Sequence, residues 1–459
     1  MSGLSRRAFL KGSLAGAAYL GLAGLPLDAF AKSERPPNFI FILADDLGYQ
    51  DVGCFGSPLI KTPNLDRMAS EGMRFTDFYS AAPVCTPSRA ALMTGCYPMR
   101  VGLPAVLSAT TGLEMGISSD EILLPQLLKT RGYATACIGK WHLGYDKRFL
   151  PTRHGFDYFY GLPHSNDMNK PEPVPLMRGE HVIERPAIIE TLTERYTDEA
   201  IKFITKHKDE PFFLYLPHTF PHTPLAASER FKGKSERGLY GDVVETIDWS
   251  AGRILDTLKE LGLDENTLVI FTSDNGPWLI KGKDGGSALP LRGGKAQTWD
   301  GGMREPCIMR WPGHIPSGST CSEMATMMDV YPTLAHLSGA KVPTDRIIDG
   351  KDIRPLMTGE KDAKSPHDVF FYYRVDRLEA VRSGKWKLIL PHKDVSTKED
   401  VPPALYDLKT DIGETTDLSV KYPSIVKRLQ AMAATCREDL GDLVTGAKGK
   451  NTRPCGKVD

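Results

Sequence analysis

The segment from Cys85 to Gly95 reads CTPSRAALMTG and combines a cysteine, an arginine and helix-forming signals. Thr86 suits an N-cap, Pro87 the first helical position and Gly95 the C-terminal stop, so a short helix is predicted between them. Cys85 would then lie just ahead of a helix N-terminus, where free N–H groups and the helix dipole favour an anion. Arg89, one turn further on, can reach the same anion. The alternative is an ordinary buried apolar cysteine beside a helix.

Two apolar runs each lead into a pair of residues with oxygen-bearing side chains. Asp45 and Asp46 follow the run NFIFILA, and Asp274 and Asn275 come shortly after the run TLVIFT. Either pair alone is more often a turn or a helix cap. Together the four side chains supply an oxygen-only set that suits a hard cation. Calcium is favoured over magnesium, because magnesium prefers to keep more water ligands than such a cage allows.

Further candidates for anion binding and proton transfer lie in four loops. Lys140 and His142 stand in GKWHLG, Lys295 stands in GGK ahead of GGMREP, and Ser165 stands in GLPHSND. The segment PHTFPHTP, which follows the run FFLYL, holds two histidines. Taken singly, such residues are more often solvated or part of a turn. The two histidines are His218 and His222.

The elements that would position these residues alternate between helix and strand. The apolar runs have the continuous pattern of strands that are buried on both faces of a parallel sheet. The predicted class is therefore α/β, with a large, mostly parallel sheet sandwiched by helices. In such sheets ligands bind beyond the carboxyl ends of strands, where the acidic pairs stand. Strands are predicted at 38–44, 134–138, 212–216 and 267–272, and helices at 193–206 and 241–261.

The last part of the chain has a different pattern. After a catalytic domain at 32–365, we expect a small C-terminal antiparallel α+β domain at 366–459, with a four-stranded sheet and one helix. The tail from Thr445 is expected to be loosely ordered. The four strands are predicted at 369–373, 378–383, 385–390 and 404–407, and the helix at about 423–436.

The composition is that of a globular protein. Hydrophobic residues make up 41% and charged residues 25% of the 459 residues, which excludes disordered, collagen-like and membrane classes. The 57 Lys and Arg residues balance the 57 Asp and Glu residues, so no nucleic-acid partner is expected. The eight cysteines show no paired or zinc-binding spacing. Cys436 and Cys455, which flank a Gly-rich tail, are the one candidate disulfide.

The first 31 residues have the features of an export signal. The sequence SRRAFLK at 5–11 precedes a weakly apolar stretch, and AFA at 29–31 is a small-residue cleavage site. The stretch contains four glycines and Pro26, so a stable membrane anchor is not favoured. The pattern resembles a twin-arginine signal. It implies export of the folded protein by the twin-arginine translocase of a bacterium, to the periplasm or the medium.

CTPSRAALMTG has the CxPSRxxxxTG form of the sulfatase signature, and the chain resembles the arylsulfatase A and N-acetylgalactosamine-6-sulfatase branch of that family, within the alkaline phosphatase superfamily. The resemblance implies that a formylglycine-generating maturation enzyme oxidises Cys85 to formylglycine (3-oxoalanine), which hydrates to a geminal diol. One hydroxyl attacks sulfur, and the second lets sulfate leave by hemiacetal collapse. The resemblance also implies one calcium ion, bound by the two acidic pairs and an oxygen of the modified Cys85.

GKWHLG resembles the second sulfatase signature. This implies that Lys140 binds a sulfate oxygen and that His142 accepts a proton as the hemiacetal collapses. His222 precedes a residue and then a proline, as the family's catalytic histidine does, so it is expected to assist the leaving oxygen. His218 is then the competing, more structural histidine. Lys295 resembles the lysine that spans a sulfate oxygen and the leaving-group oxygen.

Ser165 matches the serine of a serine-histidine pair in arylsulfatase A, which implies a sulfate contact. The next residue here is Asn166, so the role of that position is open. The implied activity is hydrolysis of an organic sulfate ester, with a sulfated carbohydrate as the first expectation. Rival interpretations are a formylglycine-dependent phosphonate monoester or phosphodiester hydrolase, and a non-catalytic carbohydrate-binding protein that kept the fold.

Overall fold

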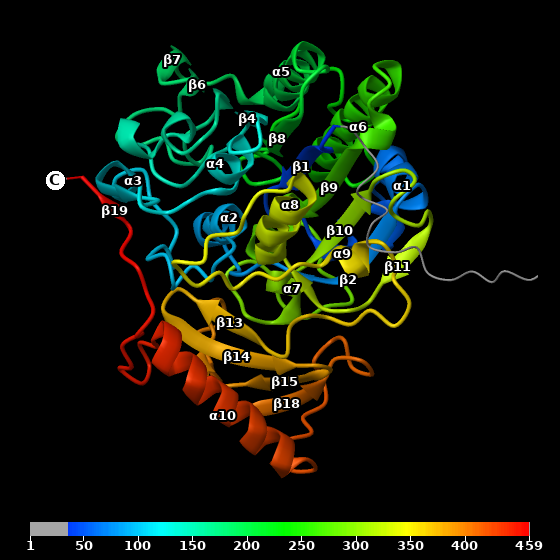
Figure 1. Cartoon of the computed structure of the whole chain (residues 1–459). Helices are drawn as coiled ribbons and strands as arrows, with labels where there is room; N and C mark the ends of the chain where they lie inside the picture. Colours follow the sequence, from blue (N-terminus) through cyan, green and yellow to red (C-terminus); the bar gives the residue numbers. More distant parts are fainter. Residues whose placement is uncertain (1–34, 459) are drawn as a thin grey trace, which may run out of the picture. The chain divides into compact units, whose positions relative to one another are not determined.

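The computed structural model describes residues 35–458, and its largest element is a mixed sheet of eleven strands (Figure 1). At its centre, β1 (Asn38–Ala44) lies between β8 (Phe212–Pro217) and β9 (Thr267–Ser273), and all three strands are parallel. β4 (Ala134–Ile138) and β5 (Tyr158–Gly161) extend this parallel part beyond β8. Every residue of β1, β8 and β9 is buried, as the continuous apolar runs predict.

Six further strands complete the sheet. They are β2 (Met73–Tyr79), β6 (Leu176–Arg178), β7 (His181–Glu184), β10 (Arg304–Arg310), β11 (Ser319–Cys321) and β12 (Ala325–Thr326). The strand order is β11-β2-β10-β9-β1-β8-β4-β5-β6-β7, and β12 pairs with β2. β10 runs antiparallel to β9 and β2, and β6 runs antiparallel to β5 and β7.

Helices cover both faces of this sheet (Figure 1). They are α1 (Pro63–Ser70), α2 (Cys85–Thr94), α3 (Thr111–Glu114), α4 (Leu124–Lys129), α5 (Leu192–Lys206), α6 (Leu239–Glu260), α7 (Asp300–Met303), α8 (Val330–Ser338) and α9 (Arg354–Met357). α1, α5 and α6 share one apolar core with alternate residues of β1, among them Ile40 and Ile42. α2, α4 and α8 contact one another over the other face. The predicted class and the helices α5 and α6 are confirmed.

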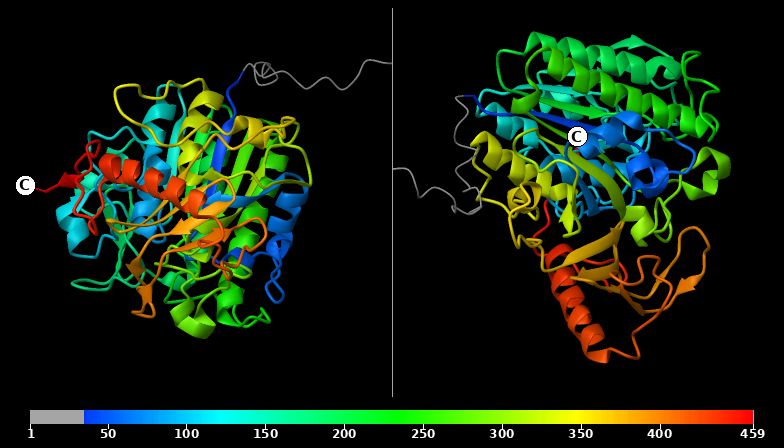
Figure 2. Two further views of the ribbon diagram at one scale, coloured as in Figure 1. Left: turned by 90° about the horizontal axis from the view of Figure 1, so that it is seen from below. Right: turned by 90° about the vertical axis from the view of Figure 1, so that its right-hand side faces the viewer.

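The C-terminal part forms a second, antiparallel sheet in the order β13-β14-β15-β18. Its strands are β13 (Phe370–Arg374), β14 (Arg377–Ser383), β15 (Trp386–Ile389) and β18 (Ala404–Asp407), and α10 (Pro423–Leu440) packs against β14 and β15 (Figure 2). Tyr79 and Trp299 join Phe370 and Tyr372 in one apolar cluster. The small sheet therefore packs directly against the end of β2 and the segment before α7.

The tail after Thr445 is ordered, contrary to the prediction. β19 (Gly456–Lys457) pairs with β3 (Met115–Gly116), and Arg453 Nε donates to Glu121 Oε1 at 2.6 Å. The candidate disulfide is also wrong. Cys436 stays inside the longer helix α10 with its Sγ 3.3 Å from Tyr373 Oη, and Cys455 is a free thiol elsewhere in the tail. Two more short strands, β16 (His392–Lys393) and β17 (Asp400–Val401), form a small hairpin.

The predicted signal at residues 1–31 lies outside the described residues. None of the helices in the described part of the chain has the length and apolar character that a bilayer span requires.

Candidate active site

Cys85 is the first residue of α2 rather than a residue ahead of it. The N-cap is Val84, and Gly95 ends the helix in the left-handed conformation with φ of 68°, as predicted. Thr86 does not cap the helix, because its Oγ1 accepts a hydrogen bond from the Leu107 N–H at 3.2 Å. The predicted N-cap is therefore wrong, since a contact with a later loop uses this hydroxyl. Cys85 remains in the first turn, where N–H groups are free.

The two acidic pairs meet at the carboxyl ends of adjacent strands. β1 and β9 pair along their whole length, so Asp45 and Asp274 leave the sheet side by side. The Asp46 N–H donates to Asp274 Oδ1 at 3.3 Å, and Asn275 Nδ2 donates to Asp46 Oδ1 at 2.8 Å. All four side chains are buried. The structure thus brings the predicted oxygen-bearing set together.

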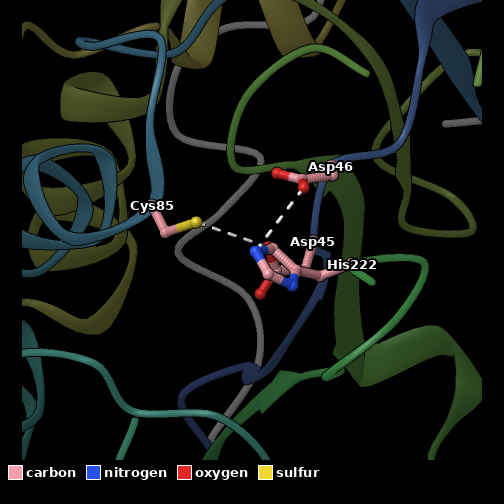
Figure 3. Close-up of side chains that lie close together, drawn as sticks. All are labelled: Asp45, Asp46, Cys85 and His222. Atoms are coloured by element: carbon pink, nitrogen blue, oxygen red, sulfur yellow. Dashed lines mark hydrogen bonds and ion pairs between the residues drawn. The ribbon is translucent and has the colours of Figure 1, made fainter. Parts of the chain in front are cut away.

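Cys85, Asp45, Asp46 and His222 converge on one point (Figure 3), where one ligand atom from each lies within 4.8 Å of the others. Cys85 Sγ donates to Asp45 Oδ1 at 3.4 Å, and His222 Nε2 is 3.8 Å from Asp46 Oδ2. These residues come from the start of α2, the end of β1 and the loop after β8. Three distant segments therefore build one buried site.

Arg89 links the carboxylates to one another. Its Nε donates to Asp274 Oδ2 at 2.9 Å, its Nη2 to Asp45 Oδ2 at 3.0 Å and its Nη1 to the carbonyl of Lys140 at 2.6 Å. The guanidinium is fully buried. Such charge-assisted bonds fix planar geometry, so Arg89 holds the two strand ends and the Lys140 loop in one arrangement.

Two lysines complete the positive side of the site. Lys140 Nζ forms a buried ion pair with Asp45 Oδ2, and Lys295 Nζ lies 2.8 Å from Asp46 Oδ2 and 3.8 Å from Cys85 Sγ. Burial alone would raise the pKa of Asp45, but Lys140 and Arg89 hold it well below its usual range. Asp45 is therefore ionised at neutral pH.

The remaining carboxylates have less compensation. Burial and the charge of Asp45 raise the pKa of Asp274 to about 6, and burial raises the pKa of Asp46 despite its contact with Lys295. Asn275 Oδ1 is a buried acceptor with no hydrogen-bond partner among residues 35–458. Two buried carboxylates whose pKa values are raised despite adjacent cations, together with an amide oxygen that has no partner among the described residues, fit a hard cation. The residues present therefore fit the calcium ion that the sequence predicts.

Burial raises the pKa of the Cys85 thiol far above its ordinary value, and the adjacent Asp45 raises it further. Lys140 and Lys295 oppose this effect without overcoming it. The thiolate is the nucleophilic form of cysteine, so an unmodified Cys85 is a poor nucleophile at neutral pH.

Ser165 connects two of the predicted residues. Its Oγ is 3.3 Å from Lys140 Nζ and 3.4 Å from His222 Nδ1. The neighbouring Asn166 Nδ2 donates to the carbonyl of Pro224 at 3.0 Å. Asn166 thus joins the Ser165 loop to the loop that carries His222. The role of this position, which the sequence left open, includes this structural contact.

His142 and His222 both present one ring nitrogen that does not bond the backbone. His142 Nε2 is 3.0 Å from the carbonyl of Leu107, so Nε2 carries the proton and the buried Nδ1 is an acceptor without a partner among the described residues. His222 Nδ1 is 2.6 Å from the carbonyl of Thr223, which leaves Nε2 facing Asp46. Burial, with nearby lysines, lowers the pKa of His222 to about 3. Burial also lowers the pKa of His142 well below its usual range.

His218 lies apart from this cluster. Neither ring nitrogen has a hydrogen-bond partner within residues 35–458, and its ring lies 6.5 Å from the ring of Tyr196. The sequence interpretation missed Trp278, whose ring centroid lies 5.4 Å from that of His222 and 4.3 Å from Lys295 Nζ. Its position directly after the Asp274 segment was the available signal.

Comparisons with known proteins identify the family of this chain. The family model described as Sulfatase matches residues 37–340, and the model described as N-sulphoglucosamine sulphohydrolase, C-terminal, matches residues 294–439. The chain is 45% identical to N-acetylgalactosamine-6-sulfatase of Mus musculus over 462 residues, which cover 91% of this chain and 88% of that protein. It is 39% identical to arylsulfatase A of Bos taurus, covering 86% of this chain and 85% of that protein.

Among solved structures, Ps i-CgsB in complex with k-i-k-neocarrahexaose is similar, with a TM-score of 0.77 and 33% identity. The match covers 88% of this chain and 93% of the other. The family model and the relatives cover most of the chain, and the chain belongs to the sulfatase family, whose members are sulfuric ester hydrolases.

Proposed function

We propose that this protein hydrolyses the sulfate ester of a carbohydrate, using Cys85 after its conversion to formylglycine. The observation that carries the proposal is the convergence of Cys85 with Asp45, Asp46 and Lys295 at the end of β1. The high pKa of the buried thiol supports the conversion, because a neutral thiol neither attacks sulfur readily nor releases a bound sulfate. Hydrated formylglycine supplies a hydroxyl nucleophile and a second hydroxyl that allows sulfate to leave.

Positive groups on two sides of residue 85 would bind the sulfate. Lys140 Nζ and Ser165 Oγ are 3.3 Å apart and form one side, and Lys295 Nζ forms the other. The free N–H groups at the start of α2 add donors for sulfate oxygens. Preorganised donors of this kind stabilise negative charge without rearranging during the reaction.

A calcium ion would be held by Asp45, Asp46, Asp274 and Asn275. It would lower the cost of ionising a hydroxyl at residue 85 and offset the charge of the sulfate. Arg89 keeps Asp45 and Asp274 in place through two charge-assisted hydrogen bonds. The unpaired Oδ1 of Asn275 is the structural feature that most directly supports a bound cation.

The two histidines would divide the proton transfers. His142 carries a proton on Nε2 and is neutral, so its Nδ1 is suited to accept a proton from residue 85. His222 directs Nε2 at the site, and a bound sulfate ester adds negative charge beside it, which favours its protonated form. It can then donate to the leaving oxygen.

A sulfated sugar is the proposed substrate class. The name of one relative specifies a sulfated amino sugar, and one similar structure holds a carrageenan-type oligosaccharide. The test is a screen of purified protein against sulfated mono- and oligosaccharides, with an aryl sulfate and an aryl phosphonate assayed in parallel. Release of sulfate that Cys85→Ala abolishes supports the proposal. Faster turnover of the phosphonate would favour the rival hydrolase, and no turnover of any ester would favour a binding protein.

We further propose that the protein reaches the periplasm or the medium through the twin-arginine translocase, after a maturation enzyme has modified Cys85. The support is the SRRAFLK pattern at residues 5–11. Replacing Arg6 and Arg7 by lysine and following the protein in cell fractions tests this route. Unchanged export of the lysine variant would contradict it.

A further inference from the structure

The loop that carries Lys295 has two separate sets of supports. On one side, the Lys295 N–H donates to the carbonyl of Pro277 at 2.9 Å, and the Ala296 N–H donates to the carbonyl of Pro83 at 2.8 Å. Both acceptors belong to the part of the chain that forms the large sheet. These bonds anchor the backbone of Lys295 and Ala296, and the Gln297 N–H closes a turn around both residues by donating to the carbonyl of Gly294 at 3.0 Å.

The second set of supports comes from the C-terminal sheet. Arg374 Nε of β13 donates to the carbonyl of Ala296 at 3.1 Å. Thr298 Oγ1 donates to Glu379 Oε2 of β14 at 2.9 Å, and Lys387 Nζ of β15 donates to the carbonyl of Thr298 at 2.9 Å. Three strands of that sheet therefore bond residues directly after the lysine.

Gln297 connects the two flanks of Lys295. Its Oε1 accepts a hydrogen bond from the Gly294 N–H at 3.1 Å, and its Nε2 donates to Asp394 Oδ2 at 2.8 Å. Asp394 is itself fixed, because its Oδ1 accepts from the N–H groups of Ser396 and Thr397 at 2.7 and 2.9 Å. The Gln297 amide group thus reinforces the turn around Lys295 and ties it to the C-terminal part.

Packing does not replace these bonds. A cavity of about 390 Å³ lies between the Lys295 loop and the segment between β16 and β17. Arg292, Gln297 and Trp299 line one side of it, and Asp394 and Glu399 line the other. Ala296 adopts φ of 68°, a conformation that a residue with a Cβ holds only when its surroundings impose it. Main-chain hydrogen bonds to Pro277 and Pro83, together with side-chain hydrogen bonds from the C-terminal part, therefore hold this backbone.

We propose that Gln297 is a positioning residue for Lys295, through which the loop between β16 and β17 sets the place of the lysine ammonium beside residue 85. The inference rests on the proposed function of Lys295 in sulfate-ester hydrolysis. Among residues 35–458, Gln297 forms no hydrogen bond with Cys85 or with the carboxylates of the active site. Its effect on the site must therefore pass through Lys295.

A double-mutant cycle tests this dependence. Gln297→Met keeps the length of the side chain and removes both hydrogen bonds, and it should lower kcat/KM on an aryl sulfate about tenfold. In the Lys295→Met background the same change should cost less than about twofold, because the lysine that it positions is absent. Glu399→Gln is the matched control and should match wild type, because Glu399 lines the same cavity and its side chain forms no hydrogen bond with the Lys295 loop among residues 35–458. An equal loss in both backgrounds, or no loss, would overturn the proposal.

A second readout does not depend on activity. The Lys295 side chain is 9% exposed and paired with Asp46, so it should react slowly with an amine-acetylating reagent. Gln297→Met should speed acetylation of Lys295 several-fold at an unchanged Tm, as measured by peptide mass spectrometry, while Lys140 stays protected. Acetylation of Lys295 at the wild-type rate would overturn the positioning role. This result stands even if the protein hydrolyses no sulfate ester, so the two proposals fail separately.

Discussion

Arg89 Nε donates a hydrogen bond to Asp274 Oδ2 at 2.9 Å and so joins the helix that begins at Cys85 to the end of a strand 185 residues later in the chain. The same guanidinium reaches Asp45 through Nη2. Because a lysine offers neither the fork nor its planarity, it cannot make both contacts. The arrangement of the acidic set thus depends on one side chain.

Arg89→Lys should therefore lower kcat/KM about ten- to a hundredfold, since the lysine keeps the charge but loses a hydrogen bond to a buried carboxylate, which contributes about 1.5–3 kcal/mol. Steady-state assays and thermal unfolding measure the effect. Arg100→Lys is the matched control, because Arg100 is another buried arginine with two ion pairs, to Asp349 and Asp439. The control should lose stability but keep its catalytic rate. Equal activity losses in the two variants would contradict the proposed role of Arg89 in arranging the acidic side chains.

Removal of calcium should cost both activity and stability. Without a cation, Asp45, Asp46 and Asp274 place like charges together, and bound ion at a hundredfold excess over Kd stabilises a protein by about 2.7 kcal/mol. Thermal unfolding in chelator, followed by calcium return, measures this. Asp274→Asn should weaken the response, whereas Asp51→Asn, at a buried aspartate bonded to Tyr240, should keep it. A chelated, metal-free protein with full activity would refute the calcium site.

Active protein should contain an aldehyde at residue 85. The expected result is a peptide with the mass of formylglycine in place of cysteine, together with reaction of that peptide with a hydrazine reagent. Cys85→Ala should abolish turnover with little change in Tm, because the thiol makes only weak hydrogen bonds, to Asp45 and from Lys295. Active protein that yields only unmodified Cys85 would disprove the conversion.

His222 and His142 should differ in their dependence on the leaving group. His222→Ala should impair esters of basic alcohols, such as sugars, far more than activated aryl sulfates, because only the former need a proton on the leaving oxygen. His142→Ala should release one equivalent of phenol rapidly and then stall. Turnover across aryl sulfates of graded phenol acidity, with burst kinetics, measures both effects. A steep dependence for His218→Ala and none for His222→Ala would reverse the assignment.

His218 should make stability sensitive to acid. Burial lowers its pKa to about 3, whereas an unfolded histidine titrates near 6.5. Below pH 6.5 the unfolded chain binds a proton that folded His218 does not, so stability falls from pH 6.5 toward 3 and is unaffected above that range. At pH 5 the loss is about 2 kcal/mol. Urea unfolding of His218→Leu should show a flatter pH dependence than wild type, and the exposed His181→Leu should not.

The sequence predicted the elements best where a single local cause determines them. The strands at 38–44 and 134–138 were predicted with their observed bounds, because continuous apolar runs leave no exposed face. Gly95 was predicted as the helix stop because its left-handed conformation suits glycine. Thr86 failed as an N-cap because its hydroxyl bonds Leu107, a contact that requires the folded loop.

The same distinction applies to the site. Signature residues such as Lys140 and Lys295 could be identified from their short motifs, and the structure brings both to Asp45 and Asp46. Gln297 could not, because nothing in a glutamine specifies a partner until the chain has folded, and the only signal for Trp278 was its position directly after the Asp274 segment. The ordered structure of the C-terminal tail was not predicted for a related reason. Its Gly- and Lys-rich composition gives no sign that β19 pairs with β3.

The burial of Cys85 also limits the time during synthesis in which an enzyme can reach this residue. In the folded chain the residue is 2% exposed, so an enzyme of any size must reach it before folding is complete. The bond between Arg89 and Asp274 closes the site, and the ribosome needs roughly 10 to 40 s to add the 185 residues between them at about 5–20 residues per second. For that interval the cysteine has left the ribosome while the pocket around it does not yet exist. The wide separation of α2 and the end of β9 along the chain would therefore give the proposed maturation enzyme time to act.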